Sequence, residues 1–345
     1  MELALRLGAR GWGKTSPNPM VGAVVVKDGK IVGMGYHEGV GLPHAEVMAL
    51  TKAGENAKGA VLYVSLEPCC HYGRTPPCTD EIIRSGIKRV VIPLLDPNPL
   101  VSGGGVRRLR EAGIEVTIGV CKEKARKANE IFFKWIRTNL PFVILKVATS
   151  IDGRIAGPYG RRIHFTCEKA DREVHRLRAG VDAILIGRNT LVRDDPLLTV
   201  RFVKGKNPER IIISKSGRIP RSARIFSEGP LPVIVATNNA NVSAEDVEIW
   251  HFKGNEIKGV DLLKRAGSAG ISSILIEGGT RTISWALREK IVDKIMIFIS
   301  PIFVGKGKLL AEAIEAFELH NVEIKRIGSN VLISGYTPWG QIYDG

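Results

Sequence analysis

The chain has 345 residues, of which 44% are hydrophobic and 25% are charged. At about 150 residues per domain, this length predicts two domains of ordinary globular composition. No apolar run reaches the ~18 residues that a membrane-spanning helix needs. The first residues, MELALRLGARGWGK, have neither the apolar stretch nor the cleavage site of a signal peptide. We therefore expect a cytoplasmic protein that binds no membrane.

The formal net charge of +15 raises the question of nucleic-acid binding. Lys and Arg are spread along the whole chain without a basic arm, so we expect no nucleic-acid partner. A positive field would equally suit an enzyme with phosphorylated substrates. The five cysteines are too few for a disulfide framework, and Cys69, Cys70 and Cys78 lie close together. In a reducing compartment such clustering is typical of metal ligands or catalytic groups.

The first half of the chain alternates between helix and strand patterns. The expected elements, in chain order, are a helix (2–10), two strands (21–27 and 30–35), a helix (45–53), a strand (60–65), a helix (79–85), a strand (89–93), a helix (105–112), a strand (115–118) and a helix (122–137). Asp28-Gly29 predicts a tight hairpin between the first two strands. The later strand–helix alternation predicts a mixed sheet with helices on its faces.

Residues Thr138-Asn139-Leu140-Pro141 form a plausible hinge, after which a second α/β pattern begins. Its expected elements are a strand (142–147), a helix (168–179), four strands (183–187, 210–214, 233–237 and 273–277), a helix (282–289) and a strand (294–300). Because this half has its own apolar strands, two independent domains are expected rather than one large one.

Three short segments predict a metal site: His44-Ala45-Glu46, Glu67-Pro68-Cys69-Cys70 and Pro76-Pro77-Cys78. A hydrolytic zinc site needs three His or Cys ligands, an open position for water, and a nearby acid–base group. Zinc deaminases carry His-x-Glu followed by Pro-Cys and a second cysteine, with the Glu outside the coordination shell. Taken singly, a surface His beside a helical Glu is commonplace and buried cysteines act as small hydrophobes. The conjunction in this order favours a deaminase.

The spacing of the cysteines departs from the commoner deaminase pattern, because position 72 is Tyr where a second cysteine usually stands. The string from Glu67 to Cys78 instead resembles the E-P-C-x-H-x-G-R-T-P-P-C motif of the riboflavin-biosynthesis deaminases. Matching segments in the first half are Thr15–Gly22, Pro43–Glu46 and Asp96–Pro99. The second half is similar to the reductase domain of the same family, through Lys146–Arg154, Leu177–Ala179, Asp194–Arg201 and Glu277–Gly279.

The resemblance implies a bifunctional enzyme. Residues 1–138 would form a cytidine-deaminase-like α/β/α domain with a mixed sheet, which deaminates 2,5-diamino-6-ribosylamino-4(3H)-pyrimidinone 5′-phosphate. Residues 139–345 would form a dihydrofolate-reductase-like α/β domain, which reduces the ribosyl group to ribityl with NADPH. The expected cofactors are Zn²⁺ and NADPH, the expected partner is the phosphorylated ribosylaminopyrimidine substrate, and a homo-oligomer is expected.

Carried over by position, the resemblance makes His44, Cys69 and Cys78 the zinc ligands and Glu46 the proton shuttle. The residues that it places at the substrates are Asn18 in the deaminase and Arg178, Leu198, Arg201 and Glu277 in the reductase. The residues that it places at NADPH are Ala148, His164, Thr190, Asp194, Gly279, Thr280, Arg281, Thr282, Ile283, Ser284 and Trp285.

Cys78 rather than Cys70 is expected to be the third ligand. A residue adjacent to Cys69 normally points elsewhere, and Pro76-Pro77 delivers Cys78 to the start of a helix. There the helix N-terminus would lower the pKa of the thiol and favour the thiolate. His71 is the other rival, but the resemblance places it in the substrate pocket.

Three features of the reductase half are less specific than these matches. Gly278-Gly279-Thr280 opens a helix directly after a strand, which suits either a phosphate or an ordinary helix-start turn. His164-Phe165-Thr166 stands where the family usually has a Trp-Ile-Thr-type segment, and His164 would still stack. Lys215 stands where the family commonly has Ser; it would pair with the 2′-phosphate of the cofactor or be an ordinary solvated lysine.

Two other functions remain open from the sequence. One is a nucleotide or nucleic-acid deaminase with an accessory domain, although no strip of aromatic and basic residues for stacking bases is visible. The other is a zinc-stabilised ligand-binding or sensor protein without turnover. Glu46 argues against the sensor, because a non-catalytic site has no use for a carboxylate beside an open metal position.

Overall fold

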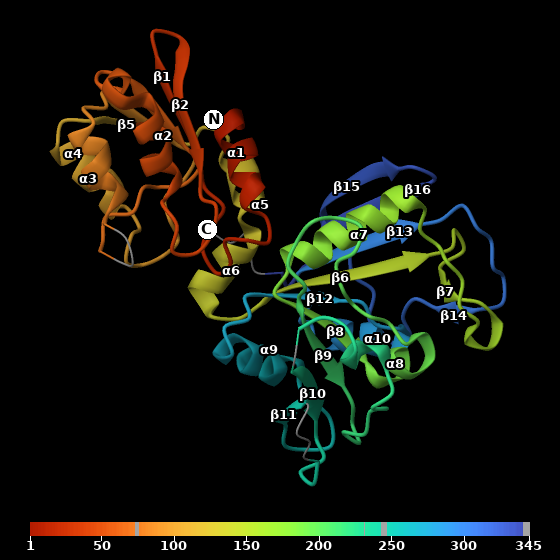
Figure 1. The fold of residues 1–345 in the computed structure, drawn as a ribbon. Coiled ribbons are helices and arrows are strands. Elements are labelled where there is room, and N and C mark those ends of the chain that lie inside the picture. The colour runs from red at the N-terminus through yellow and green to blue at the C-terminus, as the bar shows by residue number, and fades with distance from the viewer. Residues whose placement is uncertain (73–75, 231, 243–246, 341–345) are drawn as a thin grey trace. The chain divides into compact units, whose positions relative to one another are not determined.

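The structure is a computed structural model that describes residues 1–72, 76–230, 232–242 and 247–340. The chain divides into two compact units, Met1–Thr138 and Asn139–Gly345 (Figure 1). None of the described helices is both long enough and apolar enough to span a membrane. Each unit has its own sheet and its own buried core, and each is considered separately below.

The first unit is built on a mixed sheet of five strands in the order β2-β1-β3-β4-β5. Its strands are β1 (Gly22–Lys27), β2 (Lys30–Tyr36), β3 (Val61–Val64), β4 (Arg89–Ile92) and β5 (Glu115–Ile118). β1 pairs antiparallel with β2 and β3, whereas β3, β4 and β5 are parallel. Asp28 and Gly29 make the predicted hairpin, with φ of 48° and 74°. The predicted mixed sheet is therefore confirmed.

Helices cover both faces of this sheet. α2 (Ala45–Ala53), α3 (Cys78–Arg84) and α4 (Gly104–Glu111) contribute to one apolar core, which includes Ala23 and Val25 of β1. α1 (Glu2–Gly8) packs on the other face, against Val24. Successive side chains of a strand point to opposite faces, so the run Gly22–Lys27 serves both layers. The predicted α/β/α arrangement is confirmed.

The single helix predicted over 122–137 is wrong, because the structure has two. α5 (Lys122–Ala128) ends and α6 (Glu130–Thr138) begins on either side of Asn129, whose φ and ψ are −116° and 26°. The Asn129 side chain bonds the backbone of Met20 through both its amide atoms, at 3.0 and 2.7 Å. A partner 109 residues away along the chain has no local signature in the helix pattern.

The second unit is built on a nine-stranded sheet in the order β11-β10-β9-β8-β12-β6-β13-β16-β15. Its strands are β6 (Phe142–Thr149), β8 (Ala183–Gly187), β9 (Glu209–Ile213), β10 (Val233–Thr237), β11 (Val247–His251), β12 (Ser273–Ile276), β13 (Lys294–Ile299), β15 (His320–Ile327) and β16 (Asn330–Tyr336). The strands from β11 to β13 are parallel, and β16 and β15 add antiparallel to that edge. A separate two-stranded sheet joins β7 (Arg154–Ala156) to β14 (Lys308–Leu309).

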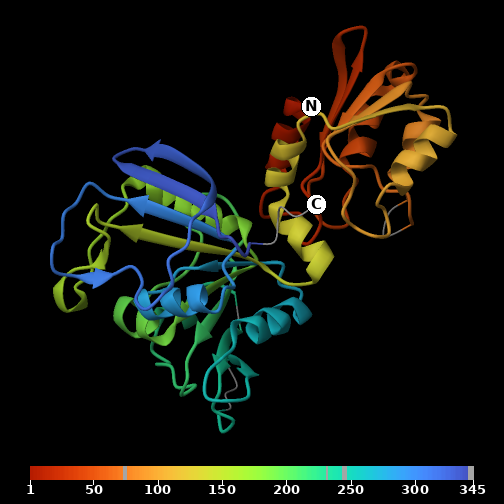
Figure 2. The same ribbon diagram turned by 180° about the vertical axis from the view of Figure 1, so that it is seen from behind.

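The large sheet is also covered on both faces. α9 (Gly259–Ser268) and α10 (Thr280–Arg288) share one apolar core with β6 and β8, and α7 (Glu168–Gly180) lies on the opposite face (Figures 1 and 2). The sequence patterns did not predict α9, the short helix α8 (Arg188–Asp194), or β7, β11, β14, β15 and β16. β15 has no buried side chain, although Val322 and Ile324 alternate with polar residues along it.

Substitution Gly33→Ala is expected to destabilise the first unit, because α2 packs directly on β2. A Cβ at Gly33 would lie 2.1 Å from the carbonyl oxygen of Ala49, so the helix would have to move. We expect the free energy of unfolding to fall by about 1–3 kcal/mol, as overpacked cores usually show. Denaturant unfolding measures it. Gly39→Ala is the control, since its nearest contact is an ordinary 3.5 Å, and an equal loss in both variants would contradict the prediction.

Candidate active sites

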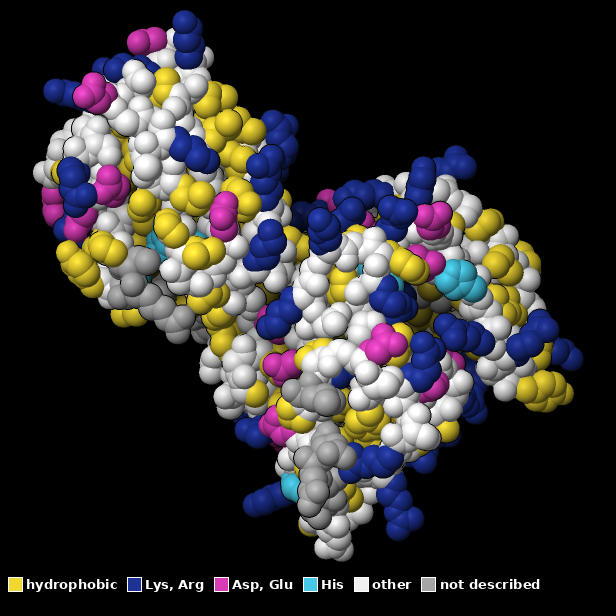
Figure 3. All heavy atoms as spheres, viewed as in Figure 1, with side chains coloured by type: hydrophobic (Ala, Val, Ile, Leu, Met, Phe, Trp, Pro, Cys, Tyr) yellow, Lys and Arg dark blue, Asp and Glu magenta, His cyan; other side chains and the backbone are white. Residues whose placement is uncertain are grey.

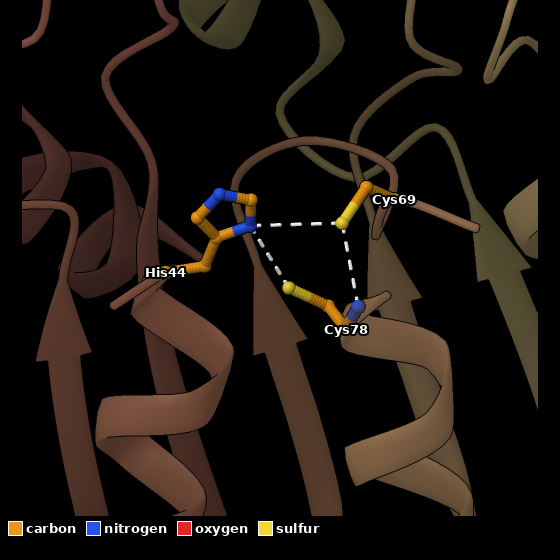
Figure 4. A group of neighbouring side chains, drawn as sticks. All are labelled: His44, Cys69 and Cys78. Carbon is orange, nitrogen blue, oxygen red and sulfur yellow. Dashed lines mark hydrogen bonds between the residues drawn. The ribbon is translucent and has the colours of Figure 1, made fainter. Parts of the chain in front are cut away.

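Three side chains of the first unit converge on one point (Figure 4). The Nδ1 atom of His44 lies 3.0 Å from the sulfur of Cys78 and 3.6 Å from that of Cys69. All three potential ligand atoms lie within 4.8 Å of one another, and no other such group of His, Cys, Asp or Glu occurs among the described residues. One imidazole and two thiols match the donors that Zn²⁺ prefers and leave a fourth tetrahedral position open.

The three converging residues come from three adjacent elements. His44 is the N-cap of α2, Cys69 follows β3, and Cys78 is the first residue of α3. The backbone N–H of Cys78 donates to the sulfur of Cys69 at 3.3 Å, which ties the start of α3 to the turn after β3. The sheet and its two helices therefore bring together side chains that are up to 34 residues apart in the chain.

A hydrogen bond between the thiols of Cys69 and Cys78 shifts their pKa values in opposite directions. The hydrogen bond from Cys78 and the neighbouring His44 lower the pKa of Cys69 to about 4, against the effect of burial. Cys78 donates that hydrogen bond and is buried, so its pKa is raised well above the usual value. The expectation that the start of α3 lowers the pKa of Cys78 is therefore wrong. Because zinc binds thiolates, ion binding has to release the Cys78 proton.

Glu46 lies in the first turn of α2, two residues after His44, and is 3% exposed. Burial raises the pKa of its carboxyl to about 7, although the charge of His44 acts in the opposite direction. A carboxyl group with this pKa can both accept and donate a proton near neutral pH. Its carboxyl group is not one of the three converging groups but lies beside them, in a hydrogen bond with the thiol of Cys78.

A cavity of 440 Å³ opens onto this cluster, and its lining includes His44, Cys69 and Glu46. Asn18, which the sequence predicted, lines it, and its amide nitrogen lies 3.4 Å from Nε2 of His37. Several other lining residues have no role predicted from the sequence, among them His37, Asp96, Asn98, Phe132, Trp135 and Ile136. Phe132, Trp135 and Ile136 form the apolar face of α6. The sequence pattern predicted a helix there but did not show that this face lines a cavity.

The loop that carries Asp96 is held by Glu67, whose carboxylate is buried. This carboxylate accepts hydrogen bonds from the backbone N–H groups of Asp96 and Gly103 at 3.0 Å and of Val106 at 2.9 Å. The Glu of the Glu-Pro-Cys segment therefore fixes one edge of the cavity to the turn that carries Cys69. Burial raises the pKa of Asp96 to about 7, and the charge of Glu67 adds to this rise.

Neither rival of Cys78 joins the cluster. The sulfur of Cys70 points to the carbonyl of Val101, 4.0 Å away. His71 lines the cavity instead, and its buried Nδ1 makes no hydrogen bond within the part of the chain that the structure describes. Gly73, Arg74 and Thr75 of the same motif lie outside the described residues.

A second cavity, of 380 Å³, lies in the other unit. Of the residues expected at NADPH, those that line it are Ala148, His164, Thr190, Asp194, Gly279, Thr280, Arg281 and Thr282. The hydroxyl of Thr190 accepts a hydrogen bond from the N–H of Gly279, the N-cap of α10, at 3.2 Å. The remaining expected residues, Ile283, Ser284 and Trp285, do not line it, and the Ile283 side chain is buried in the core behind.

The residues expected at the reductase substrate adjoin this cavity. Arg178, Leu198 and Arg201 line a neighbouring cavity of 420 Å³, which shares Arg162 and Asp194 with the first. Glu277 lines the 380 Å³ cavity. It forms a bidentate ion pair, at 2.7 and 3.0 Å, with Arg178 of the neighbouring cavity.

The charge of Glu277 is fixed by two cations. Burial alone would raise its pKa, but Arg178 and Lys146 lower the pKa to about 2. The Lys146 ammonium lies 3.6 Å from the carboxylate. Glu277 therefore stays ionised at any physiological pH, unlike the buried Glu46.

Lys215 is exposed and lines neither of these two cavities. The geometry thus agrees with its interpretation as a solvated lysine rather than a partner of the 2′-phosphate. The Lys and Arg residues that do line the 380 Å³ cavity are Lys146, Arg162, Arg193, Arg281 and Lys308. On the face seen in Figure 3, Lys and Arg side chains are spread over both units.

Comparison with known proteins bears on both units. A family model described as the cytidine and deoxycytidylate deaminase zinc-binding region matches residues 1–94, and one described as the RibD C-terminal domain matches residues 141–333. The riboflavin biosynthesis protein RibD of Aquifex aeolicus is 47% identical over 344 residues, 96% of each chain. That of Escherichia coli is 38% identical and covers 96% of this chain and 97% of its own. The chain belongs to the RibD family.

Solved structures of the RibD family agree with this assignment. A Thermotoga maritima diaminohydroxyphosphoribosylaminopyrimidine deaminase/5-amino-6-(5-phosphoribosylamino)uracil reductase has a TM-score of 0.88 at 38% identity, covering 98% of this chain and 97% of that one. Acinetobacter baumannii RibD has a TM-score of 0.85 at 35% identity, covering 97% of both chains. The predicted fold class, a deaminase-like domain followed by a reductase domain, is confirmed.

As a RibD protein, this chain is a bifunctional enzyme of riboflavin biosynthesis, a deaminase and a reductase. Its cofactors are zinc and NADPH, as the sequence predicted. A nucleotide or nucleic-acid deaminase with an accessory domain is not favoured, because the relatives match both halves of the chain.

Cys78→Ser is expected to lose most of its bound zinc, whereas Cys70→Ser is expected to keep it. The sulfur of Cys78 is one of the three converging ligand atoms, and the sulfur of Cys70 points away from them. Metal analysis of the purified variants measures the zinc content per chain. The reverse pattern would show that the ligand set is wrong.

Glu277→Gln is expected to destabilise the second unit, because it leaves Arg178 and Lys146 as neighbouring buried cations. Removing one partner of a buried pair costs about 3–5 kcal/mol. Denaturant unfolding of the second unit measures this loss. Glu168→Gln removes the partner of Arg172 from an exposed pair on α7, so it should cost less than about 1 kcal/mol. Equal losses in the two variants would contradict this account.

Proposed function

We propose that Met1–Thr138 is the deaminase and that it acts on the diaminohydroxyphosphoribosylaminopyrimidine named for the Thermotoga maritima relative. The observation that supports this most directly is the buried Glu46 beside the cluster of His44, Cys69 and Cys78, in a cavity of 440 Å³. The reaction replaces the ring amine by a carbonyl oxygen from water and releases ammonia.

We assign three roles to residues at this cavity. His44, Cys69 and Cys78 hold zinc, which supplies the Lewis acidity that hydrolysis of an aminopyrimidine needs. Glu46 takes a proton from water and passes it to the departing amine, which its pKa of about 7 suits. Asn18, at the wall of the cavity, binds the pyrimidine ring through its amide.

We propose that Asn139–Gly345 is the reductase and that it converts the ribosyl group of the deaminated product to ribityl. NADPH supplies the hydride. The proposed cofactor contacts are Ala148, His164, Thr190, Asp194 and Gly279 through Thr282, all of which line the 380 Å³ cavity. Arg178, Leu198 and Arg201, in the adjoining cavity, together with Glu277, bind the phosphorylated substrate.

The other expected NADPH contacts, the cellular location and the oligomeric state stay predictions. Ile283, Ser284 and Trp285 are proposed to support the cofactor through the packing of α10, because they do not line the cavity. A cytoplasmic location is proposed because zinc needs reduced thiols, and all five cysteines are free. A homo-oligomer without a nucleic-acid partner is the expected assembly.

Glu46→Ala is expected to remove deamination and to spare reduction. Loss of a general acid–base group lowers the rate by at least about 10²–10⁴-fold. Ammonia release from the diaminopyrimidine ribotide measures the first activity, and NADPH oxidation with deaminated substrate measures the second. The exposed Glu55 provides the control variant Glu55→Ala, which should retain both. Equal collapse of the two activities in folded Glu46→Ala would refute the assignment of one reaction to each unit.

A further inference from the structure

Helix α6 forms part of the deaminase cavity. Phe132, Trp135 and Ile136 line the same cavity as His44 and Glu46. The match to the deaminase zinc-binding region ends at residue 94, so this wall is built from a part of the chain outside it. Correct placement of α6 against the rest of the unit is therefore a condition for the shape of the cavity.

Asn129 stands where α6 begins and is 3% exposed. Its backbone N–H donates to the carbonyl of Ala125 at 3.3 Å, and its carbonyl accepts from the N–H of Phe133 at 2.9 Å. Its backbone thus joins the end of α5 to the first turn of α6, which leaves its side chain free to face another segment.

The segment that it faces is the loop that ends at Met20. The Asn129 amide nitrogen donates to the Met20 carbonyl at 3.0 Å, and its amide oxygen accepts from the Met20 N–H at 2.7 Å. Pro17, Asn18 and Pro19, directly before Met20, line the cavity. One buried amide therefore connects two walls of the cavity, the loop with Asn18 and helix α6.

We propose that Asn129 is a positioning residue for deamination, which holds the loop of Asn18 and the wall of α6 at the separation that the substrate requires. The proposal rests on the proposed function of the first unit. Only a side chain with one donor and one acceptor at this length satisfies both backbone groups of Met20. The proposed zinc ligands come from α2, α3 and the turn after β3, whereas the Asn129 side chain hydrogen-bonds the loop at Met20.

Asn129→Asp tests the proposal with a near-isosteric change. Assayed at alkaline pH, where the buried carboxyl group is ionised, Asp keeps the acceptor for the Met20 N–H but sets an oxygen against the Met20 carbonyl. We expect the KM of deamination to rise about tenfold or more, since small displacements of positioning groups have effects of this size. Zinc content and reductase activity, measured on the same protein, should not change.

Asn56→Asp is the matched control, because it makes the same change of charge at an exposed position of the same unit. Its KM for deamination should equal that of the unmodified chain. A KM in Asn129→Asp within twofold of this control would overturn the proposal. Loss of zinc together with deamination would also overturn it, because the role would then be one of stability alone.

Two further measurements distinguish a failure of the role proposed for Asn129 from a failure of the proposed function. Exchange of the Met20 amide hydrogen should accelerate in Asn129→Leu, which removes the acceptor of the Met20 N–H, whatever the substrate of the enzyme proves to be. Trp135→Ala should raise the KM through the wall of α6 while Met20 exchange stays slow. If the unmodified chain releases no ammonia from the diaminopyrimidine ribotide, the proposed function fails. Unchanged Met20 exchange in Asn129→Leu instead refutes the positioning role of Asn129.

Discussion

The deaminase site depends on how closely α2 packs on β2. A Cβ at Gly33 or Gly35 would come within 2.5 Å of a backbone oxygen of α2, so the helix rests directly on the strand. Because His44 caps α2 and Glu46 lies in its first turn, this contact sets the height of both groups above the sheet. β3 pairs with β1 and leads into the turn that carries Cys69, so this turn starts from the same sheet.

Glu46 and Glu277 show how surroundings decide what a carboxyl group can do. Glu46 is buried with little opposing charge, so its pKa rises to about 7 and it can exchange a proton. The Glu277 side chain is 9% exposed, and Arg178 and Lys146 lower its pKa to about 2 against the effect of burial. The first is suited to proton transfer and the second to holding cations in place. The same residue type therefore suits the proposed hydrolysis in one unit and fixed electrostatics in the other.

The sequence predicted the parts of the molecule whose signals are local. The zinc cluster was found because its three segments carry a specific motif, and β5, β8, β10 and α2 were found at their observed bounds because their patterns are regular. The break at Asn129 was missed because it depends on Met20, far away in the chain. The role of Trp135 was missed for a similar reason, since an apolar helix face does not reveal whether it meets a core or a cavity.

Both sites lie where parallel strands end, which explains why one architecture supports two chemistries. Cys69 follows the carboxyl end of β3, Glu277 follows that of β12, and Thr190 follows that of β8. In open α/β sheets, ligands bind at this edge, because the loops there are free to vary while the strands hold them in place. The residues that line the deaminase cavity and those that line the reductase cavities belong to separate units. A substitution in one cavity therefore leaves the other activity as an internal measure of correct folding.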